Sequence, residues 1–275
     1  MAQTLSSAAR AGQQPAQQAR HRAYLRSMEY WMYRYKLTWR SSIVYTFSNP
    51  LLFMAAIGFG LGTLVNKSPT ADLGVSYLTF VAPGLLAGAA MQMAAGEASF
   101  PVLGAVRWWK VYHAMLATPL NVADVLVGHL LWMGCMVGIS CGGFFFAMLV
   151  FGTVHSWLAV FALPACLLIG MAFATPITAF AASITNDAGF AVLFRMIVLP
   201  LLLFSGVFLP VDRMPALLRW LAYGTPLWHG VDLVRGLTLG GIRPGVAATH
   251  VAYLAALTVI GFVLARRAFA KEMVK

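Results

Sequence analysis

The sequence predicts an all-α, polytopic membrane protein with six transmembrane helices, an N-terminal interfacial helix and two short re-entrant helices before the last span. Of its 275 residues, 60% are hydrophobic and only 10% are charged, whereas globular domains have about 25% charged residues. Apolar runs of about 20 residues, the length that crosses a bilayer as a helix, occur six times in the chain. A soluble fold of this size would lack the polar surface to cover itself.

The N-terminal part contains two different segments. Residues 1–23 are rich in Ala, Gln, Ser and Arg, which is typical of disorder, so we expect a disordered cytoplasmic tail followed by a transmembrane domain over 24–275. Residues 24–40 then repeat apolar and aromatic side chains at helical spacing, among basic residues. This pattern predicts a helix that lies in the membrane interface. Its apolar face would hold Met28, Trp31, Met32, Tyr35 and Trp39.

The six predicted spans cover 43–65, 77–100, 124–151, 157–185, 190–209 and 248–266. An even number of spans places both termini on one side of the membrane. Basic residues precede the first span and follow the last, so the positive-inside rule makes that side cytoplasmic. We expect no cleavable signal peptide, because no short apolar region with a small-residue cleavage site precedes the first span.

Two acidic residues lie near span ends. Glu97 is close to the end of the second span, and an ionisable group at membrane depth is by default a hypothesis of function. The alternative is that Glu97 is solvated at the interface or pairs with Arg107 or Lys110. Asp124 follows Asn121 by three residues, which is the pattern of a capped helix start with a favourable first-turn charge.

The segment between the second and third spans is too polar to cross a membrane, yet its apolar residues keep helical spacing. It predicts a short amphipathic helix inside the cell, ended by a Thr-Pro pair and joined rigidly to two spans. Such a helix can receive force from a cytoplasmic partner, or it can be a plain connector. Its candidate coupling residues are Arg107, Trp108, Lys110, Val111, Tyr112, Met115, Thr118 and Pro119.

A second polar interruption, residues 208–237, precedes the last span. Pro215 and Gly224 bound one short helix, and Thr225 with Pro226 begins another. Each helix has about half the length of a span, which predicts two re-entrant helices inserted from the outer side. Their candidate functional residues are Asp212, Arg219, Pro226, His229, Asp232 and Arg235.

No catalytic or metal-binding pattern is present in the sequence. It contains no GxxxxGK[ST], HExxH or GxSxG motif, and its three cysteines lie singly in apolar runs. We therefore expect no catalytic residue, no metal site and no cofactor bound directly, and we expect His129 and His250 to be packed polar residues. The net charge of +11 follows from the positive-inside bias, so nucleic acid is not an expected partner.

Two runs, KVYHAMLATPLNVADVLVGHLLW (110–132) and FSGVFLPVDRMPALLRWLAYGTPLWHGVDLVRGL (204–237), resemble the membrane subunits of ABC-2 type (type V fold) ABC exporters. They are most similar to the branch with the nodulation lipo-oligosaccharide exporter permease and the actinobacterial drug-resistance permeases. The resemblance covers most of the chain, from Tyr24 to the end of the last span. Many relatives have an acidic residue where His129 stands, which leaves any role for charge there open.

The resemblance implies a permease that works as a dimer, here expected to be a homodimer, with two copies of a separate ABC ATPase that binds ATP and Mg. It also implies that the ATPase contacts the interfacial helix and the coupling helix, which would be the segment from Arg107 to Leu116 with the turn at Thr118 and Pro119. The paired short helices would lie on the outer side, near the exit of the transport path.

The leading functional hypothesis is a non-catalytic permease of the bacterial inner membrane that exports a hydrophobic or amphiphilic substrate, such as a lipid-linked glycan, a glycolipid or a drug. The alternatives are an ion-coupled secondary transporter that uses Glu97 as its proton or cation carrier, and a structural membrane protein without transport activity. A flux assay without ATP distinguishes the ATP-driven permease from the ion-coupled transporter.

Overall fold

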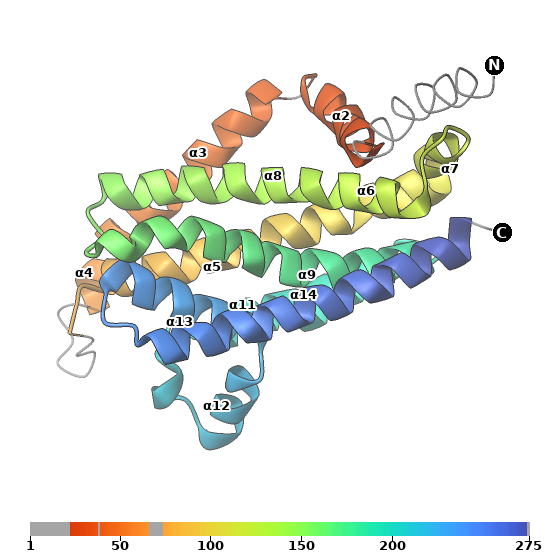
Figure 1. Cartoon of the computed structure of the whole chain (residues 1–275). Helices are drawn as coiled ribbons and strands as arrows, with labels where there is room; N and C mark the ends of the chain where they lie inside the picture. Colours follow the sequence, from red (N-terminus) through yellow and green to blue (C-terminus); the bar gives the residue numbers. More distant parts are fainter. Residues whose placement is uncertain (1–22, 38, 66–73, 274–275) are drawn as a thin grey trace, which may run out of the picture.

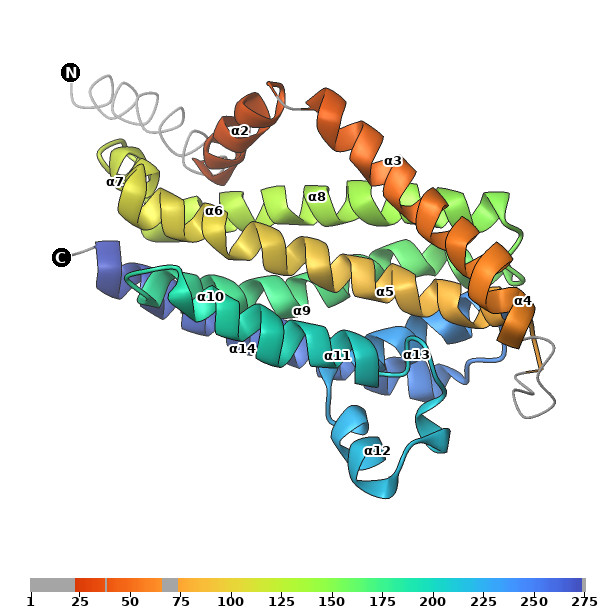
Figure 2. The same cartoon turned by 180° about the vertical axis from the view of Figure 1, so that it is seen from behind.

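A computed structural model describes residues 23–37, 39–65 and 74–273, so the predicted tail lies outside the described residues except for Ala23. In the described part the chain forms helices and no strands. The long helices run side by side in an elongated bundle, with α2, α7 and the described C-terminus at one end and α4 at the other (Figures 1 and 2). We call these ends the α7 end and the α4 end.

The bundle is assembled from α-helices and from short π or 3-10 turns, which are labelled η. In chain order they are α2 (Ala23–Tyr35), α3 (Trp39–Ala55), η1 (Ala56–Leu61), α4 (Gly62–Val65), α5 (Tyr77–Ala98), α6 (Phe100–Leu103), η2 (Gly104–Trp108), α7 (Val111–Leu116), α8 (Val122–Val150), η3 (Trp157–Phe161), α9 (Ala162–Ser183), α10 (Ala188–Val192), η4 (Leu193–Val198), α11 (Leu199–Phe204), η5 (Val211–Arg213), α12 (Ala216–Tyr223), α13 (Pro226–Leu239) and α14 (Pro244–Met273).

Four helical runs are long and apolar enough to cross a membrane: Tyr77–Trp108, Val122–Val150, Trp157–Ser183 and Pro244–Met273. They correspond to the second, third, fourth and sixth predicted spans. The first and fifth predicted spans are represented by shorter apolar helices, Pro50–Val65 and Ala188–Phe204. The all-α class and several membrane-length helices are therefore confirmed in the described part of the chain, while the count of six spans stays a prediction.

The last span runs from Pro244 to Met273 instead of 248–266, and two other span boundaries differ from the prediction for local reasons. The second run continues past Ala98 through α6 and η2 to Trp108, because Ser99 bends the helix without ending it. The fifth ends at Phe204 instead of residue 209, because the chain leaves the helix at Ser205 and Gly206 adopts φ +81°, a left-handed conformation that favours glycine.

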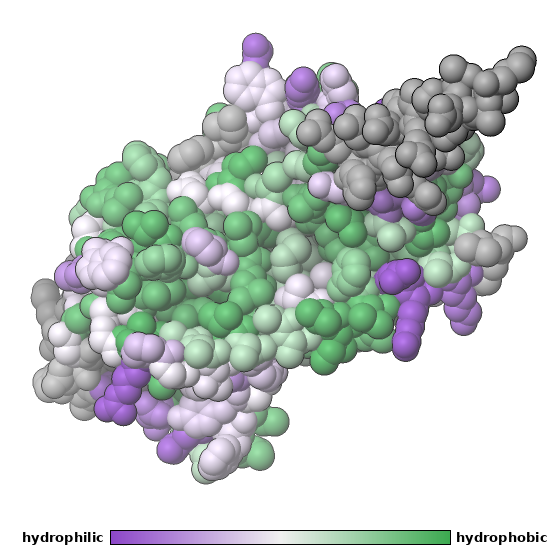
Figure 3. All heavy atoms as spheres, in the orientation of Figure 1, coloured by the Kyte–Doolittle hydropathy of each residue, from purple (hydrophilic) through white to green (hydrophobic). Residues whose placement is uncertain are grey.

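Helix α9 occupies the centre of the bundle and packs against α5, α8, α13 and α14. The Thr175 hydroxyl of α9 donates a hydrogen bond to the carbonyl oxygen of Thr258 in α14 at 3.2 Å. By contrast, α14 exposes large apolar side chains, among them Val259, Ile260 and Leu264. Hydrophobic residues cover the middle of the face shown in Figure 3, and hydrophilic ones gather towards its ends, as expected for a surface that contacts lipid.

The predicted interfacial helix over 24–40 is wrong at its C-terminal side. Helix α2 ends at Tyr35, a turn follows through Lys36 and Leu37, and Trp39 begins α3. Trp31 is buried against the bundle, but Met32 and Trp39 are exposed. The apolar spacing continues in the sequence across the turn, although the turn changes the direction of the chain and so ends the common face.

Candidate functional site

The predicted coupling helix over Arg107–Leu116 is broken in two. The π turn η2 carries Arg107 and Trp108 as the end of the second span, Lys110 adopts φ +49°, and α7 begins only at Val111. Trp108 is 54% exposed while Tyr112 is fully buried. The single amphipathic helix predicted for this segment is therefore wrong, because the left-handed residue Lys110 changes the chain direction and resets the helical spacing.

Tyr112 joins α7 to the membrane helices. Its hydroxyl makes a short hydrogen bond with Nδ1 of His129 in α8, and its ring packs 5.2 Å from the ring of Phe269 in α14. Burial raises the pKa of Tyr112 well above its ordinary value of 10, so at neutral pH the hydroxyl is protonated and donates. A neutral His129 that accepts at Nδ1 has its proton on Nε2.

Helix α2 also packs against α8 near His129. The ring of Trp31 stacks on the ring of His129, with centroids 3.9 Å apart and planes 8° apart, and the Ser27 hydroxyl donates to the carbonyl oxygen of Val125 at 3.2 Å. A Cβ on Gly128 would lie 2.5 Å from both the Ser27 Cβ and the Tyr24 carbonyl oxygen. The two helices can approach this closely only because residue 128 has no side chain.

The hydrogen-bond network at this joint is incomplete. Among the described residues, Nε1 of Trp31 and Nε2 of His129 are buried and have no hydrogen-bond partner. Such a buried donor costs roughly 1–3 kcal/mol, so ring packing holds the joint together against that cost. The expectation that His129 is a packed polar residue is confirmed.

Arg107 ties three chain segments together at the α7 end. Its guanidinium pairs with the Glu272 carboxylate at 2.5 Å and donates from Nε to the carbonyl oxygen of Ile184 at 3.3 Å. Arg107 therefore links the end of the second span to the last turns of α14 and to the chain after α9. It is not the partner of Glu97, and that proposed pairing is wrong.

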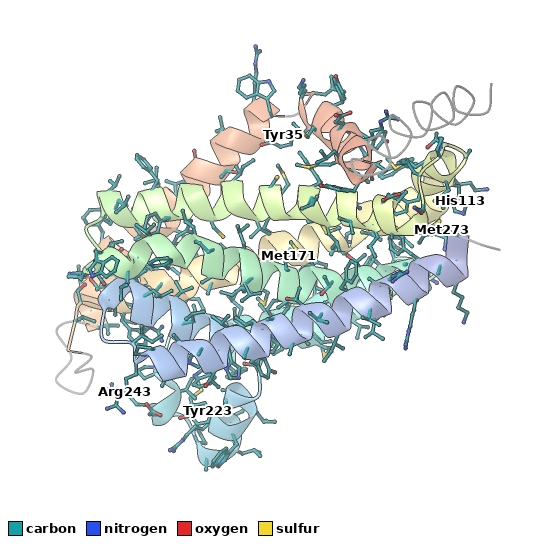
Figure 4. The ribbon with its side chains drawn as sticks, in the orientation of Figure 1. Tyr35, His113, Met171, Tyr223, Arg243 and Met273 are labelled. Carbon is teal, nitrogen blue, oxygen red and sulfur yellow. The ribbon has the colours of Figure 1, made fainter. Side chains whose placement is uncertain are left out.

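An open cleft of about 970 Å³ lies at the α7 end between α2 and α7. Arg26 and Tyr30 line it from α2, and Val111 and Met115 line it from α7. The turn after α7 contributes Thr118 and Pro119, where the Thr118 hydroxyl donates to the carbonyl oxygen of Met115 at 2.6 Å. Five of the eight candidate coupling residues thus have a definite place here: four line the cleft and Tyr112 lies beneath it. In Figure 4, His113 of α7 and Met273 of α14 are labelled at this end.

Glu97 faces a separate cavity of about 440 Å³. Its carboxylate interacts with the Trp132 indole of α8 and, at longer range, with the Arg34 guanidinium of α2. Among the described residues, no Lys, Arg or His nitrogen lies within 4.0 Å of it. Interfacial residues Trp31 and Tyr35 line the same cavity, whereas Trp39, the third residue assigned to that helix, does not.

The short helices α12 and α13 begin where the sequence predicts. Pro215 precedes α12 and Gly224 ends it, and the Thr225 hydroxyl caps α13 by accepting from the Trp228 backbone N–H at 3.3 Å. Helix α12 projects from the side of the bundle (Figure 1), and Tyr223 at its end is labelled in Figure 4. Helix α13 has 14 residues and is longer than the half span that the sequence predicts. Whether either helix is re-entrant stays a prediction.

A hydrogen bond fixes the loop before α12. The Tyr223 hydroxyl donates to Oδ1 of Asp212 at 2.8 Å, and this bond to a carboxylate raises the pKa of Tyr223 above its ordinary value. Arg219 donates from Nη2 to the Met214 carbonyl oxygen at 3.4 Å. The hydrogen bonds of Asp212 and Arg219 therefore stay within α12 and the residues that flank it.

Arg235 clamps α13 to the second span. Its Nε donates to the Phe80 carbonyl oxygen at 3.2 Å, and its Nη2 donates to the Gly206 carbonyl oxygen at 2.8 Å. The guanidinium carbon lies 3.9 Å from the Phe80 ring centroid, a cation–π geometry. Burial lowers the pKa of Arg235 to about 10, so the group remains protonated at neutral pH.

On another side of α13, a chain of polar groups reaches the last membrane helix. Oδ2 of Asp232 lies 2.9 Å from Nε2 of the buried His250, and the Nδ1 atoms of His250 and His229 lie 2.8 Å apart. Because an ionised carboxylate only accepts, a neutral His250 donates from Nε2 and accepts at Nδ1, so His229 is the donor in the second bond. His229, Asp232 and Arg235 are spaced as residues of one helix face, but the Arg235 side chain contacts α5 instead.

Several residues of these sites were not predicted from the sequence, among them Ser27, Trp132, Tyr253 and Glu272. Tyr253 stacks on His229 at 4.0 Å and donates to the Gly224 carbonyl oxygen at 2.7 Å. No local spacing identifies them, because each one acts through contacts between distant segments.

No group of three His, Cys, Asp or Glu residues that could hold a metal occurs in the part of the chain that the structure describes.

Apolar helices of membrane length define a multi-pass α-helical membrane protein, and the face shown in Figure 3 is mainly hydrophobic in its middle. Residues 28–239 match the family model described as ABC-2 type transporter. The match covers more than half of the chain, so the protein belongs to the ABC-2 type transporter family.

Curated relatives agree with this family assignment. Over 247 residues the chain is 29% identical to Nodulation protein J of Rhizobium leguminosarum bv. viciae, covering 87% of this chain and 92% of the relative. Nodulation protein J of R. leguminosarum bv. trifolii is 30% identical, with 86% and 88% covered. The protein of the same name from Sinorhizobium fredii is 31% identical, with 82% and 84% covered.

Proposed function

We propose that this chain is the membrane permease of an ATP-driven ABC exporter that moves a hydrophobic or amphiphilic substrate out of the cytoplasm or the inner leaflet. It works as a homodimer with two copies of an ABC ATPase, which bind ATP and Mg, and the permease itself performs no catalysis. It lies in the bacterial inner membrane among lipids, with the α7 end and both termini on the cytoplasmic side. Membership of the ABC-2 family supports the class.

The observation that carries the proposal is the connection between the cleft and the membrane helices. The cleft between α2 and α7 is open and lined mainly by apolar groups, so it can receive a side chain or a helix from a partner. Directly beneath it, Tyr112 and Trp31 both contact His129 in α8. A push on α7 therefore reaches a membrane-length helix through the packed Tyr112 side chain, and a push on α2 reaches it through Trp31, in both cases without a flexible linker.

The proposal is tested by co-purifying the permease with a candidate ABC ATPase and measuring ATP hydrolysis and outward transport together. Ala114 is exposed and lines the cleft, whereas Ala117 is exposed one turn later and does not line it. We expect Ala114→Glu to abolish binding of the ATPase, because a partner docked in the cleft would bury the new carboxylate. Ala117→Glu is the matched control and retains binding. Equal binding by both variants would remove the cleft as the docking site.

The ion-coupled alternative is favoured by one observation, the Glu97 carboxylate that faces a cavity without a cationic partner within 4.0 Å among the described residues. It predicts transport driven by a pH or ion gradient in proteoliposomes that contain no ATPase and no ATP. If export occurs in that assay and Glu97→Gln abolishes it, the ion-coupled mechanism would replace the proposed function. Transport only with ATPase and ATP would exclude the alternative.

A further inference from the structure

The Glu97 cavity has walls of an unusual kind. Aromatic rings surround it on several sides, contributed by Trp31, Tyr35, Trp108, Trp109 and Trp132. One carboxylate, that of half-buried Glu97, lies among them. Faces of aromatic rings attract cations, and aromatic cages recognise quaternary ammonium groups. The combination of rings with one carboxylate that has no ion pair within 4.0 Å among the described residues therefore selects for a positively charged group.

The cavity already holds one cation of the chain at its rim. The Arg34 guanidinium carbon lies 4.4 Å from the ring centroid of Trp109 and 5.8 Å from that of Trp31. No ion pair joins Arg34 to Glu97 in the described residues, since their charged atoms are more than 4.0 Å apart. The cavity therefore has a negative site inside and a positive site at the rim, an arrangement that suits a headgroup with an ammonium and an anionic group.

A second cavity, of about 520 Å³, continues from the first along the second span. Glu97, Met93 and Thr46 line both cavities. The further walls of the second one are mostly apolar and come from α3, α5, α8, α11 and the loop after it, among them Pro50, Phe53, Leu85, Ala89, Phe144 and Leu202. Figure 2 shows α3 crossing α5 and α8 on the way from α2 to α4, which is where these walls meet. The second cavity can hold an acyl chain.

We infer that the two cavities form a single binding site for an amphiphile with an ammonium-bearing headgroup. The headgroup lies in the aromatic cavity against Glu97, and the chain extends along α5 towards the α4 end. With the α7 end in the cytoplasm, this is the orientation of a lipid in the inner leaflet. The treatment of this ligand as transported cargo and its placement in the inner leaflet rest on the proposed function; the site itself does not require an ATPase.

The test uses the full chain in nanodiscs of phosphatidylglycerol, without ATPase, and two photoreactive lysolipids. Lysophosphocholine and lysophosphoglycerol probes with the same diazirine-labelled acyl chain share the phosphate and differ in the ammonium group. We expect about tenfold more labelling by the phosphocholine probe, the effect of about one charge-assisted contact. The labelled positions should lie in the second cavity, around Leu85 and Phe144.

Glu97→Gln should bring the labelling ratio of the two probes close to one. The matched control is Glu29→Gln, which removes the same charge from an exposed position on α2 and should keep the ratio. If Glu97→Gln does not give monodisperse protein, Trp108→Leu and its control Trp157→Leu decide, because both tryptophans are exposed and only Trp108 lines the cavity. Equal labelling by both probes in the wild type, or an unchanged ratio in Glu97→Gln or Trp108→Leu, would overturn the inference.

A second arm separates the two sources of such a ligand. Nanodiscs that contain phosphatidylethanolamine offer a bilayer lipid with an ammonium headgroup. Weaker phosphocholine labelling in these nanodiscs supports the site and identifies membrane lipid as its occupant. Unchanged labelling supports the site as one for a transported amphiphile. Loss of ATPase coupling with intact labelling would instead count against the proposed function and leave the binding site standing.

Discussion

Nη2 of Arg235 donates a hydrogen bond to the carbonyl oxygen of Gly206 across 2.8 Å. This contact joins α13 to the loop that follows α11. Because Nε of the same guanidinium bonds the Phe80 carbonyl oxygen in α5, one side chain connects three segments far apart in the sequence. Arg235 therefore contributes to the position of α13, and of the α12 helix before it, through a planar group whose donors have a fixed arrangement.

Replacing Arg235 with lysine should loosen the α12–α13 region although the charge is kept. A lysine ammonium cannot make both hydrogen bonds with the geometry of the guanidinium, so we expect a loss of roughly 2–3 kcal/mol of stability. Thermal unfolding in detergent and hydrogen exchange of residues 205–225 measure the effect. The control Arg243→Lys alters an exposed residue and should change neither. Identical exchange in the two variants would contradict the clamp.

Gly84 provides the space for the same contact. A Cβ at this position would lie 2.9 Å from the Val207 Cα and 3.2 Å from Nη2 of Arg235. The Val207 backbone cannot yield easily, so Gly84→Ala should lower the unfolding temperature, with a cost of about 1–3 kcal/mol.

Gly96 of the same helix is the control, because a Cβ there meets nothing within 4 Å. Gly96→Ala should be neutral or stabilise by up to about 1 kcal/mol through helix propensity. If both alanine variants unfold at the same temperature, the close approach at Gly84 is not tight enough to matter.

The sequence predicted those parts of the fold that depend on neighbouring residues. The Asn121 backbone N–H donates to the Asp124 carboxylate at 3.0 Å at the start of α8, and Thr225 caps α13. Both features follow from spacings of three residues. The break at Lys110 was missed because a lysine gives no signal of the left-handed conformation that it adopts, which glycine or asparagine would give.

The contacts that build the candidate sites could not be predicted in this way. Arg107 and Glu272 are 165 positions apart in the chain, and His229 meets His250 across the boundary between α13 and α14. Hydrophobic periodicity reports which face of a helix is buried but not which helix covers it. The sequence therefore identified Arg107, Glu97 and Arg235 as candidates without identifying their partners.

Replacing Tyr112 with phenylalanine tests the connection between α7 and α8. The ring and its contact with Phe269 are kept, but the hydrogen bond to Nδ1 of His129 is lost. We expect the ATPase to bind normally while transport-linked stimulation of ATP hydrolysis falls about fivefold, the equivalent of about 1 kcal/mol for one hydrogen bond. Tyr33→Phe, at an exposed position on α2, is the control. Full stimulation in Tyr112→Phe would show that this hydrogen bond transmits no force.

The His229–His250 pair predicts that acid destabilises the contact between α13 and α14. Burial and the neighbouring His250 lower the pKa of His229 below its ordinary value of 6.5, against the opposing effects of the Tyr223 backbone and Asp232. As the pH falls below 6.5, the unfolded chain takes up this proton before the folded one, so the free energy of unfolding decreases. The stability that neutral His229 contributes is therefore complete above pH 6.5 and is lost progressively on acidification.

Unfolding temperatures measured between pH 7.5 and pH 5.5 test this linkage. His229→Phe keeps a ring to stack on Tyr253 but cannot titrate, so its unfolding temperature should fall less over this interval than that of the wild type. His155→Phe is the matched control, because His155 is an exposed histidine whose backbone N–H, not its side chain, bonds the Thr238 carbonyl oxygen of α13. It should retain the full pH dependence. If His229→Phe and His155→Phe respond to acid in the same way, the proton is taken up elsewhere and His229 does not control the stability of this contact.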